Sequence, residues 1–314
     1  MLKLQVVRWR SIWYTISGLL IGGSILALGV WGLRQGIEFT GGSLLAVHFS
    51  HARPSIQTME QAISNAHIDT ASAVVQPVGD TDAQFRLPTL TTAQHDALMT
   101  SLKAVQGDVT ELQFDTVGPV IGQELRQKSV EGLAIALFAI MIYVAYAFRQ
   151  VSLPVQSWKY GIVTIITAFH DVIVPIGVFA ILGHFAGVEI GTPFIAAILT
   201  ILGYSITDTI VVMDRIRENL QKETGTFSEI VEMAVHQTFL RSFNTSAATL
   251  LTLFAIFFFG GASLRDFTLA LIIGIATGTY SSIFIASPLL VSWEKWSRTH
   301  AAQAAVVNKS TKKK

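Results

Sequence analysis

Six long apolar stretches constrain this chain more than any other feature of its sequence. A bilayer hydrocarbon core about 30 Å thick needs about 20 apolar residues in a helix. The stretches that reach this length are 12–33, 129–148, 161–183, 192–213, 243–260 and 265–291. Only 14% of the 314 residues are charged, whereas soluble domains are nearer about 25%. We therefore expect a polytopic α-helical membrane protein with six transmembrane helices.

The distribution of Lys and Arg predicts the orientation of these helices. With the N-terminus inside, 15 of the 22 Lys and Arg residues fall in inside segments and 7 in outside segments. The inside set includes Lys3, Arg149 and the terminal Lys312, Lys313 and Lys314. Both termini are therefore expected inside and residues 35–128 outside. The first stretch is longer than the apolar region of a signal peptide, so we expect it to stay as an anchor.

The outer segment, 35–128, has the pattern of a small α+β domain. Its strand-like runs are 43–50, 71–78, 83–90 and 109–117, and its helical runs are 55–67 and 92–105. The order β-α-β-β-α-β is that of the ferredoxin-like motif. The sequence thus predicts one small external domain between helices 1 and 2.

The remaining organisation follows from these assignments. Residues 1–34 hold the N-terminal segment and the first span, and 129–293 form a five-span bundle. The inner loop 214–241 contains a capping-box pattern, Thr226 to Glu229, which predicts a helix on the membrane face or, alternatively, a docking site for a partner. The basic tail 294–314 is expected to be disordered and attracted to anionic lipid; contact with an acidic or ribosomal surface is the alternative.

Several polar residues lie where lipid is expected, which usually means that they face protein or water. Ser205 and Asp208 are three residues apart in the fourth span and share a helix face. Asp208 is interpreted as a carboxylate that takes up and releases a proton, the alternative being a static pair with an arginine. Arg241, at the entry of the fifth span, either extends to the headgroups or belongs to the polar face with Asn244.

His170 and Asp171 lie near the middle of the third span. Being consecutive, they point about 100° apart, so they are not expected to face one small site together. Pro175 removes the helical hydrogen bond to the carbonyl of Asp171. We expect either a kinked helix with a hydrated spot or local satisfaction by hydroxyl groups. No metal-ligand spacing is present.

Other classes of function have little support in the sequence. It has no cysteine and a formal net charge of +1, so neither thiol chemistry nor nucleic-acid binding is expected. It also lacks the nucleophile-elbow, zinc-protease and P-loop motifs. We predict that the chain is not an enzyme and has no cofactor. Gly203, Gly274 and Gly278 are the small residues expected at helix contacts.

Six blocks in order carry a resemblance to a known family. They are Gly36-Ile-Glu-Phe-Thr-Gly-Gly42, Val117-Gly-Pro-Val-Ile-Gly-Gln-Glu-Leu125, His170-Asp171, the fourth-span run Gly203 to Asn219, Arg241-Ser-Phe-Asn-Thr-Ser246 and Gly278-Thr-Tyr-Ser-Ser-Ile-Phe-Ile-Ala286. Over about 280 residues the chain resembles the SecF family, the smaller membrane subunits of the bacterial SecD–SecF protein-export pair.

The resemblance implies a half of an RND-type membrane unit in the bacterial inner membrane, with 35–128 periplasmic and both termini cytoplasmic. It implies a SecD-like partner, the SecYEG channel and an unfolded preprotein as substrate. It also implies use of the proton-motive force for late translocation or release, with protons as the coupling ion. The relay residues would be Asp208 and Arg241, with Thr207, Ser205, Asp171 and His170 around them.

Two residues depart from the family pattern. Glu38 stands where the family usually has Asp, and Thr207 where it often has Asn. We expect Glu38, Gly41 and Gly42 to form mainly a turn into the external domain. Two alternative functions stay open: a structural translocase subunit that conducts no protons, and half of an RND-type exporter, which predicts a large apolar pocket in the outer portion.

Overall fold

The computed structural model describes residues 5–147 and 155–311. The predicted orienting residues Lys3, Arg149 and Lys312 to Lys314 lie outside the described residues. Two compact units divide the chain. One comprises Gln35–Gly132 with Ile190–Thr192, and the other comprises Met1–Arg34, Leu133–Glu189 and Pro193–Lys314.

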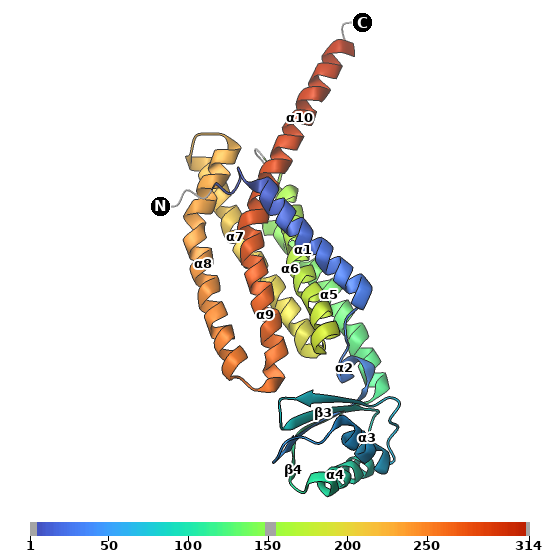
Figure 1. Cartoon of the computed structure of the whole chain (residues 1–314). Helices are drawn as coiled ribbons and strands as arrows, with labels where there is room; N and C mark the ends of the chain where they lie inside the picture. The colour runs from blue at the N-terminus through green and yellow to red at the C-terminus, as the bar shows by residue number, and fades with distance from the viewer. Residues whose placement is uncertain (1–4, 148–154, 312–314) are drawn as a thin grey trace. The chain divides into compact units, whose positions relative to one another are not determined.

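The smaller unit holds a four-stranded antiparallel sheet with two helices on one face (Figure 1). Its elements are β1 (Gly42–Phe49), α3 (Ile56–Asn65), β2 (Val74–Val78), β3 (Asp82–Leu87), α4 (Thr92–Gln106) and β4 (Val109–Val117). The strand order is β2-β3-β1-β4. The predicted β-α-β-β-α-β domain is confirmed, with each strand and helix within a few residues of its expected bounds.

The core of this domain explains why its strands and helices could be predicted from the sequence pattern. Alternate residues of β1 point to the helices, so Leu45, Val47 and Phe49 are fully buried. Helix α3 begins at Ser55, whose hydroxyl accepts from the N–H of Thr58 at 3.2 Å. The helix then buries the spaced residues Met59, Ala62 and Ile63 against the sheet.

The helical unit consists of long apolar helices (Figure 1). They are α1 (Arg10–Trp31), the end of α5 (Pro119–Ala147), α6 (Ser157–Ala186), α7 (Thr192–Lys222) from Pro193 onward, α8 (Phe227–Phe259), α9 (Ala262–Ser281), the π-helical turn η1 (Ser282–Ala286) and α10 (Ser287–Thr311). Within the described residues, six helical segments are long and apolar enough to cross a membrane. The predicted fold class is therefore confirmed.

Three predicted boundaries differ from the structure. Helix α5 begins at Pro119 rather than near residue 129. The expected inner loop 214–241 is mostly helix, because only 223–226 separate α7 from α8. The capping box at Thr226 does start a helix, but that helix continues into the span instead of ending on the membrane face. The expected disordered tail, 294–314, continues α10 as far as Thr311.

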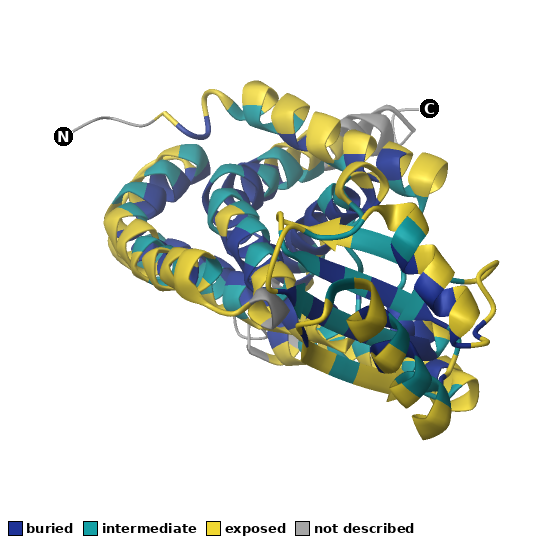
Figure 2. Ribbon diagram, turned by 60° about the horizontal axis from the view of Figure 1, so that its bottom comes forward, coloured by how far each residue is buried: buried dark blue, intermediate teal, exposed yellow. Residues whose placement is uncertain are grey.

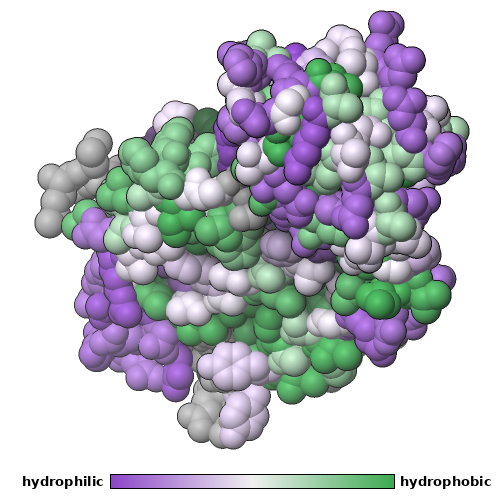
Figure 3. Space-filling view, turned by 90° about the horizontal axis from the view of Figure 1, so that it is seen from below, coloured by the Kyte–Doolittle hydropathy of each residue, from purple (hydrophilic) through white to green (hydrophobic). Residues whose placement is uncertain are grey.

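Many apolar side chains of the helical unit are not covered by the chain itself. In the most apolar 18-residue stretch of α8, only 17% of the residues are buried. Figure 2 shows exposed residues along much of the length of the long helices, and Figure 3 shows broad apolar patches on the surface. Such surfaces require lipid or another apolar partner.

Candidate functional site: two carboxylates within the membrane-spanning helices

Asp171, in the middle of α6, is fully buried and surrounded by donors. Its Oδ2 atom accepts from the hydroxyls of Ser205 on α7 and Ser281 on α9, the latter at 2.6 Å. Its Oδ1 atom lies 2.8 Å from Nδ1 of His170. A buried carboxylate is tolerated only when its oxygens are hydrogen-bonded, and three helices supply the partners here.

His170 and Asp171 therefore do meet, contrary to the expectation that consecutive residues point apart. The imidazole bends towards the neighbouring carboxylate through Nδ1, and both side chains are at most 1% exposed. Nε2 of His170 is buried and bonds to no described residue. Helix α6 continues through Pro175, and the hydroxyls of Ser205 and Ser281 bond to the carboxylate of Asp171, not to the backbone carbonyl that Pro175 leaves free.

Asp208, on α7, has a second set of donors. Its Oδ1 accepts from Ser242 of α8 at 2.5 Å, and its Oδ2 accepts from Ser282 at 2.5 Å. Both serines are buried, whereas Asp208 is partly exposed. No cation forms an ion pair with Asp208 among the residues described in the structure. The carboxylate is thus held by two neutral hydroxyl groups.

The two carboxylates are linked on both sides by neighbouring residues. On α7, Ser205 bonds to Asp171, and Asp208 lies one turn further along the same helix. Ser281, the last residue of α9, bonds to Asp171, and Ser282, the first residue of η1, bonds to Asp208. The second pair lies where α9 passes into the π-helical turn η1. Such turns often occur at functional sites because they alter side-chain direction.

The Gly-Thr-Tyr-Ser-Ser run at 278–282 has a separate contact for each residue. A Cβ on Gly278 would lie 3.0 Å from that of Ser205. The remaining contacts of the run are Thr279 to Ser246 at 2.6 Å, Tyr280 to the carbonyl of Trp13 at 3.1 Å, and the two serine–carboxylate bonds. These contacts give a physical reason why these particular residue types stand at 278–282.

Arg241 and Thr207 lie apart from these hydrogen bonds. The side chain of Arg241 is exposed on α8 and forms no ion pair within the described residues. Thr207 is also exposed, and its hydroxyl donates to the carbonyl of Gly203 at 2.8 Å. The site predicted from the sequence did not include Ser242 and Ser282, although serines within an apolar span were a usable signal.

The predicted contact glycines divide into two groups. A Cβ on Gly274 would clash with the side chain of Ile201, and one on Gly278 would lie 3.0 Å from Cβ of Ser205. These two glycines allow α9 to approach α7 closely. Gly203 has open space around it, because a Cβ at this position would meet no atom within 4 Å. It therefore contributes nothing to packing within the described chain.

The Gly36–Gly42 block is more than a turn. It contains a short helix, α2 (Ile37–Thr40). The carboxylate of Glu38 accepts from the backbone N–H of Thr192, the first residue of α7. A carboxylate at a helix N-terminus satisfies a free amide and complements the helix dipole. Glu38 therefore caps the helix that carries Asp208.

Gly41 and Gly42 are required by the backbone at the end of this block. Their φ angles are +75° and +124°, which other residues adopt only under strain. A Cβ on Gly41 would lie 2.7 Å from Cα of Pro119, and one on Gly42 would lie 2.7 Å from the carbonyl oxygen of Leu87. The turn predicted for these two glycines thus packs against the start of α5 and the end of β3.

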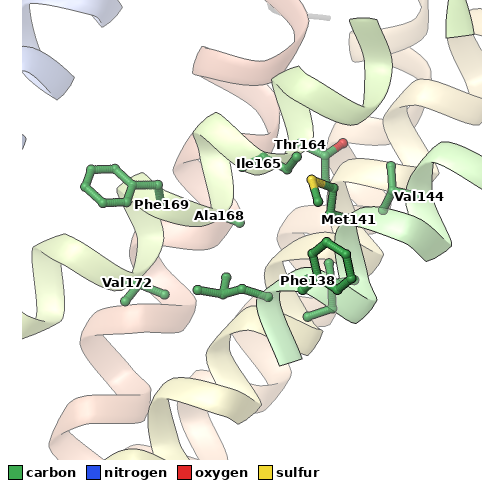
Figure 4. Close-up of a pocket in the computed structure, with 10 residues that line it drawn as sticks. Phe138, Met141, Val144, Thr164, Ile165, Ala168, Phe169 and Val172 are labelled. Carbon is green, nitrogen blue, oxygen red and sulfur yellow. The ribbon is translucent and has the colours of Figure 1, made fainter. Parts of the chain in front are cut away.

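An apolar cavity of about 280 Å³ lies between α5 and α6 (Figure 4). Phe138 and Met141 line it from α5, and Ala168 and Val172 line it from α6. Thr164 is its one polar lining residue, and its hydroxyl donates to the carbonyl of Tyr160 at 2.9 Å. The cavity therefore offers no polar group to a ligand. No group of metal-ligating side chains occurs in the described part of the chain.

Comparison with known proteins agrees with the resemblance noted in the sequence. The family model of the protein-export membrane protein SecD/SecF, C-terminal, matches residues 97–296. The protein translocase subunit SecF of Thermobaculum terrenum is 43% identical over 303 residues, which cover 93% of this chain and 94% of that protein. The SecF subunit of Synechocystis is 37% identical over 311 residues, covering 94% and 96%.

A solved structure is similar over most of the chain. The crystal structure of SecDF, a translocon-associated membrane protein from Thermus thermophilus, has a TM-score of 0.80 and 33% sequence identity. The match covers 92% of this chain but 38% of SecDF. These relatives are named as translocase subunits, not as enzymes. The chain therefore belongs to the SecF branch of the SecD/SecF family of protein-export membrane proteins.

Proposed function

We propose that this chain is a proton-coupled subunit of the Sec machinery, acting with a SecD-like partner. The observation that carries the proposal is the setting of Asp208, a carboxylate within a span whose two donors are neutral hydroxyls. An ionised carboxylate in this setting lacks a compensating positive charge. Proton uptake removes that charge, and proton release restores it, so Asp208 is suited to alternate between two states.

The serines provide a way to accommodate both states. The hydroxyl oxygen of Ser282 lies 2.5 Å from Asp208 and 3.1 Å from the carbonyl of Thr279. When the carboxylate is charged, the hydroxyl proton points to it. When Asp208 carries a proton, it can donate to the serine oxygen, and the hydroxyl proton turns to the carbonyl. Ser281 has the same choice between Asp171 at 2.6 Å and Gly278 at 3.1 Å.

His170 is suited to bring protons to this network. With Nδ1 donating to Asp171, the neutral imidazole has a free lone pair at Nε2. A water molecule at Nε2 would protonate the ring there, and the ring would then release its Nδ1 proton to Asp171. Ser205 shares a face of α7 with Asp208, whereas Thr207 is exposed and lies apart from this network. Arg241 would adjust the charge balance of Asp208 when a partner covers α8, because its exposed side chain has no acidic partner in the described chain.

Proton movement would be coupled to the substrate through helix packing against the partner. One charge moved through 100 mV provides about 2.3 kcal/mol, so a few protons could drive a modest movement of the outer domain. That domain would then pull or release a preprotein leaving the SecYEG channel. A SecD-like partner is supported by SecDF, in which a region similar to this chain makes up 38% of a longer chain.

The location follows from the same proposal. The protein would lie in the bacterial inner membrane, with both termini in the cytoplasm and residues 35–128 in the periplasm. The excess of Lys and Arg in the segments on one side supports this orientation. Protons are the coupling ion, and no organic cofactor or metal takes part.

The test is secretion of a reporter preprotein by cells carrying Asp208→Asn. We expect export to fall to the level of a deletion strain while membrane abundance and partner co-purification stay normal. Asp214→Asn is a matched control, because Asp214 is an exposed carboxylate on the same helix, 3.9 Å from Arg217. Normal export in Asp208→Asn would instead favour the structural-subunit alternative.

A further inference from the structure

A mixed polar cavity lies among the start of α1, the start of α8 and the middle of α10, all within the helical unit. Its volume is about 490 Å³, and it is open to the surface. Arg8, Arg10 and Lys295 supply three positive charges to its lining. Ser11 and Ser228 add hydroxyl groups. The segment before α1 is held in place, since Val6 and Val7 are buried.

Within the described residues, the three cations have no acidic partners. Arg8 donates to the side-chain oxygen of Gln5 at 3.0 Å, and none of Arg8, Arg10 and Lys295 forms an ion pair with any residue the structure describes. Cations that gather around an open cavity and are not ion-paired favour an anion. Arg8 and Arg10 present planar donor groups that suit phosphate oxygens.

The two carboxylates in the lining are already engaged by hydrogen-bond donors. Glu232 accepts from the backbone N–H groups of Val6 at 2.6 Å and Val7 at 2.8 Å. Glu229 accepts from the N–H and the hydroxyl of Thr226, both at 2.8 Å. Both oxygens of Glu232 and Oε2 of Glu229 are hydrogen-bonded to these donors, and the lining keeps a surplus of one positive charge.

The surroundings of the cavity are those of a membrane interface. Trp9 and Trp296, adjacent in sequence to lining residues, are 54% and 60% exposed, and tryptophan is enriched at the level of lipid headgroups. After Arg10 in the chain, exposed apolar residues of α1 follow at helical spacing, including Ile12, Ile16 and Leu19. This stripe can lie along an acyl chain whose headgroup occupies the cavity.

We propose that this cavity binds the phosphate headgroup of an anionic phospholipid. Arg10 and Lys295 hold the phosphate from two different helices, Arg8 completes the positive rim, and the lipid tail follows the exposed stripe of α1. The bound lipid joins α1 to α10 at this end of the bundle. The site is distinct from the carboxylates Asp171 and Asp208, and its test needs neither partner nor translocation.

The experiment measures lipid retention by native mass spectrometry on the purified full-length chain. Phosphatidylglycerol, phosphatidylethanolamine and inorganic phosphate are titrated separately into the detergent-solubilised protein. We expect phosphatidylglycerol to bind in preference to the other two. Arg10→Gln and Lys295→Gln should each weaken its binding about fivefold, and the double variant about 30-fold, as for cations near an anionic membrane surface.

Two controls separate this site from general attraction of lipid to positive charge. Arg217→Gln and Lys222→Gln each remove one charge outside the cavity, from residues that have acidic partners, and binding should be unchanged. A chain ending at residue 308 lacks the terminal lysines and should bind as the intact chain does. Size-exclusion profiles and helical circular dichroism test whether each variant is folded. If the double variant is not folded, the charge-conserving variant Lys295→Arg takes its place, and it should retain lipid binding.

Four results would overturn the proposal. Equal loss in Arg217→Gln and in the cavity variants would mean that total charge alone determines binding. Loss on removing the terminal lysines would assign the lipid to the tail. Saturation by inorganic phosphate with no preference for phosphatidylglycerol would indicate a site for free anions, and a preference for phosphatidylethanolamine would indicate a site for zwitterionic headgroups.

Discussion

Ser281 and Ser282 are consecutive in the chain, yet their hydroxyl groups bond to two different carboxylates. Ser281 lies 2.6 Å from Asp171 on α6, and Ser282 lies 2.5 Å from Asp208 on α7. The turn where α9 passes into η1 therefore contacts both Asp171 and Asp208. Any rotation of this turn changes the hydrogen bonding of both carboxylates together.

The first prediction concerns the donor to Asp208. Ser282→Ala removes one of its two hydroxyl partners and should reduce reporter export about tenfold, because hydrogen bonds to charged groups contribute about 1.5–3 kcal/mol. The measurement is the rate of reporter secretion at equal membrane abundance. Thr277→Ala is the control, since the hydroxyl of Thr277 bonds only to the helix backbone. Equal export by both variants would remove Ser282 from the mechanism.

The second prediction concerns the partner of His170. Asp171→Asn replaces one carboxylate oxygen with an NH₂ group. At the position of Oδ2, this group cannot accept the hydrogen bonds of Ser205 and Ser281. A buried group left without partners costs about 1–3 kcal/mol, so we expect a lower free energy of unfolding in addition to reduced export. Unfolding in mixed micelles with increasing dodecyl sulfate measures this cost. Unchanged stability together with lost export would assign Asp171 a purely functional role.

Much of the fold was predictable because its signals are local. The alternation in Leu45, Val47 and Phe49 indicated a strand with one buried face, and the spacing of Met59 and Ile63 indicated a helix. Six apolar stretches indicated six spans. Each of these patterns depends on residues within one element, so a single sequence was sufficient to read them.

The errors arose where the sequence has no local marker. No proline or glycine interrupts 227–259, so the helix that begins at Phe227 continues into the membrane instead of forming a separate interfacial helix. Asp171 and Ser281 are 110 residues apart, and only the packing of α6 against α9 brings them together. The spacing of Ser205 and Asp208 predicted a shared face, but it could not show that each residue bonds to a different helix.

The third prediction concerns the cap on α7. Glu38→Ala should destabilise the start of this helix by about 0.5–2 kcal/mol, because it leaves the N–H of Thr192 without its acceptor. Hydrogen–deuterium exchange at the first turn of α7 should accelerate. Glu60→Ala is the control, since Glu60 is an exposed glutamate on α3 outside this contact. Protection of α7 that does not change in Glu38→Ala would show that the cap is dispensable.

The fourth prediction is a pH dependence in the external domain. His48 and Asp82 face each other across β1 and β3, with Nδ1 and Oδ1 2.5 Å apart. This hydrogen bond lowers the pKa of Asp82 below its ordinary value. The bond therefore stabilises the domain above the ordinary aspartate pKa, and this stability is lost as the pH falls through the lowered pKa.

The measurement compares intact protein with Asp82→Asn at the same pH. Because both side chains are partly exposed, we expect the stabilisation at neutral pH to be no more than about 1 kcal/mol. It should appear as slower hydrogen exchange in β1 and β3 of the intact protein at pH 7, and the difference should vanish at strongly acidic pH. A difference that persists unchanged in acid would exclude ionisation of Asp82 as its cause.

The fifth prediction contrasts two helix glycines. Gly278→Ala places a methyl group 3.0 Å from Cβ of Ser205, so α9 must move away from α7 at a cost of about 1–3 kcal/mol. Gly203→Ala meets nothing within 4 Å and should stabilise its helix by about 0.5–1 kcal/mol. The free energy of unfolding in mixed micelles measures both. If Gly203 faces a partner subunit, Gly203→Leu should leave the isolated chain folded but reduce partner co-purification, whereas unchanged co-purification would mean that α7 meets no partner at this position.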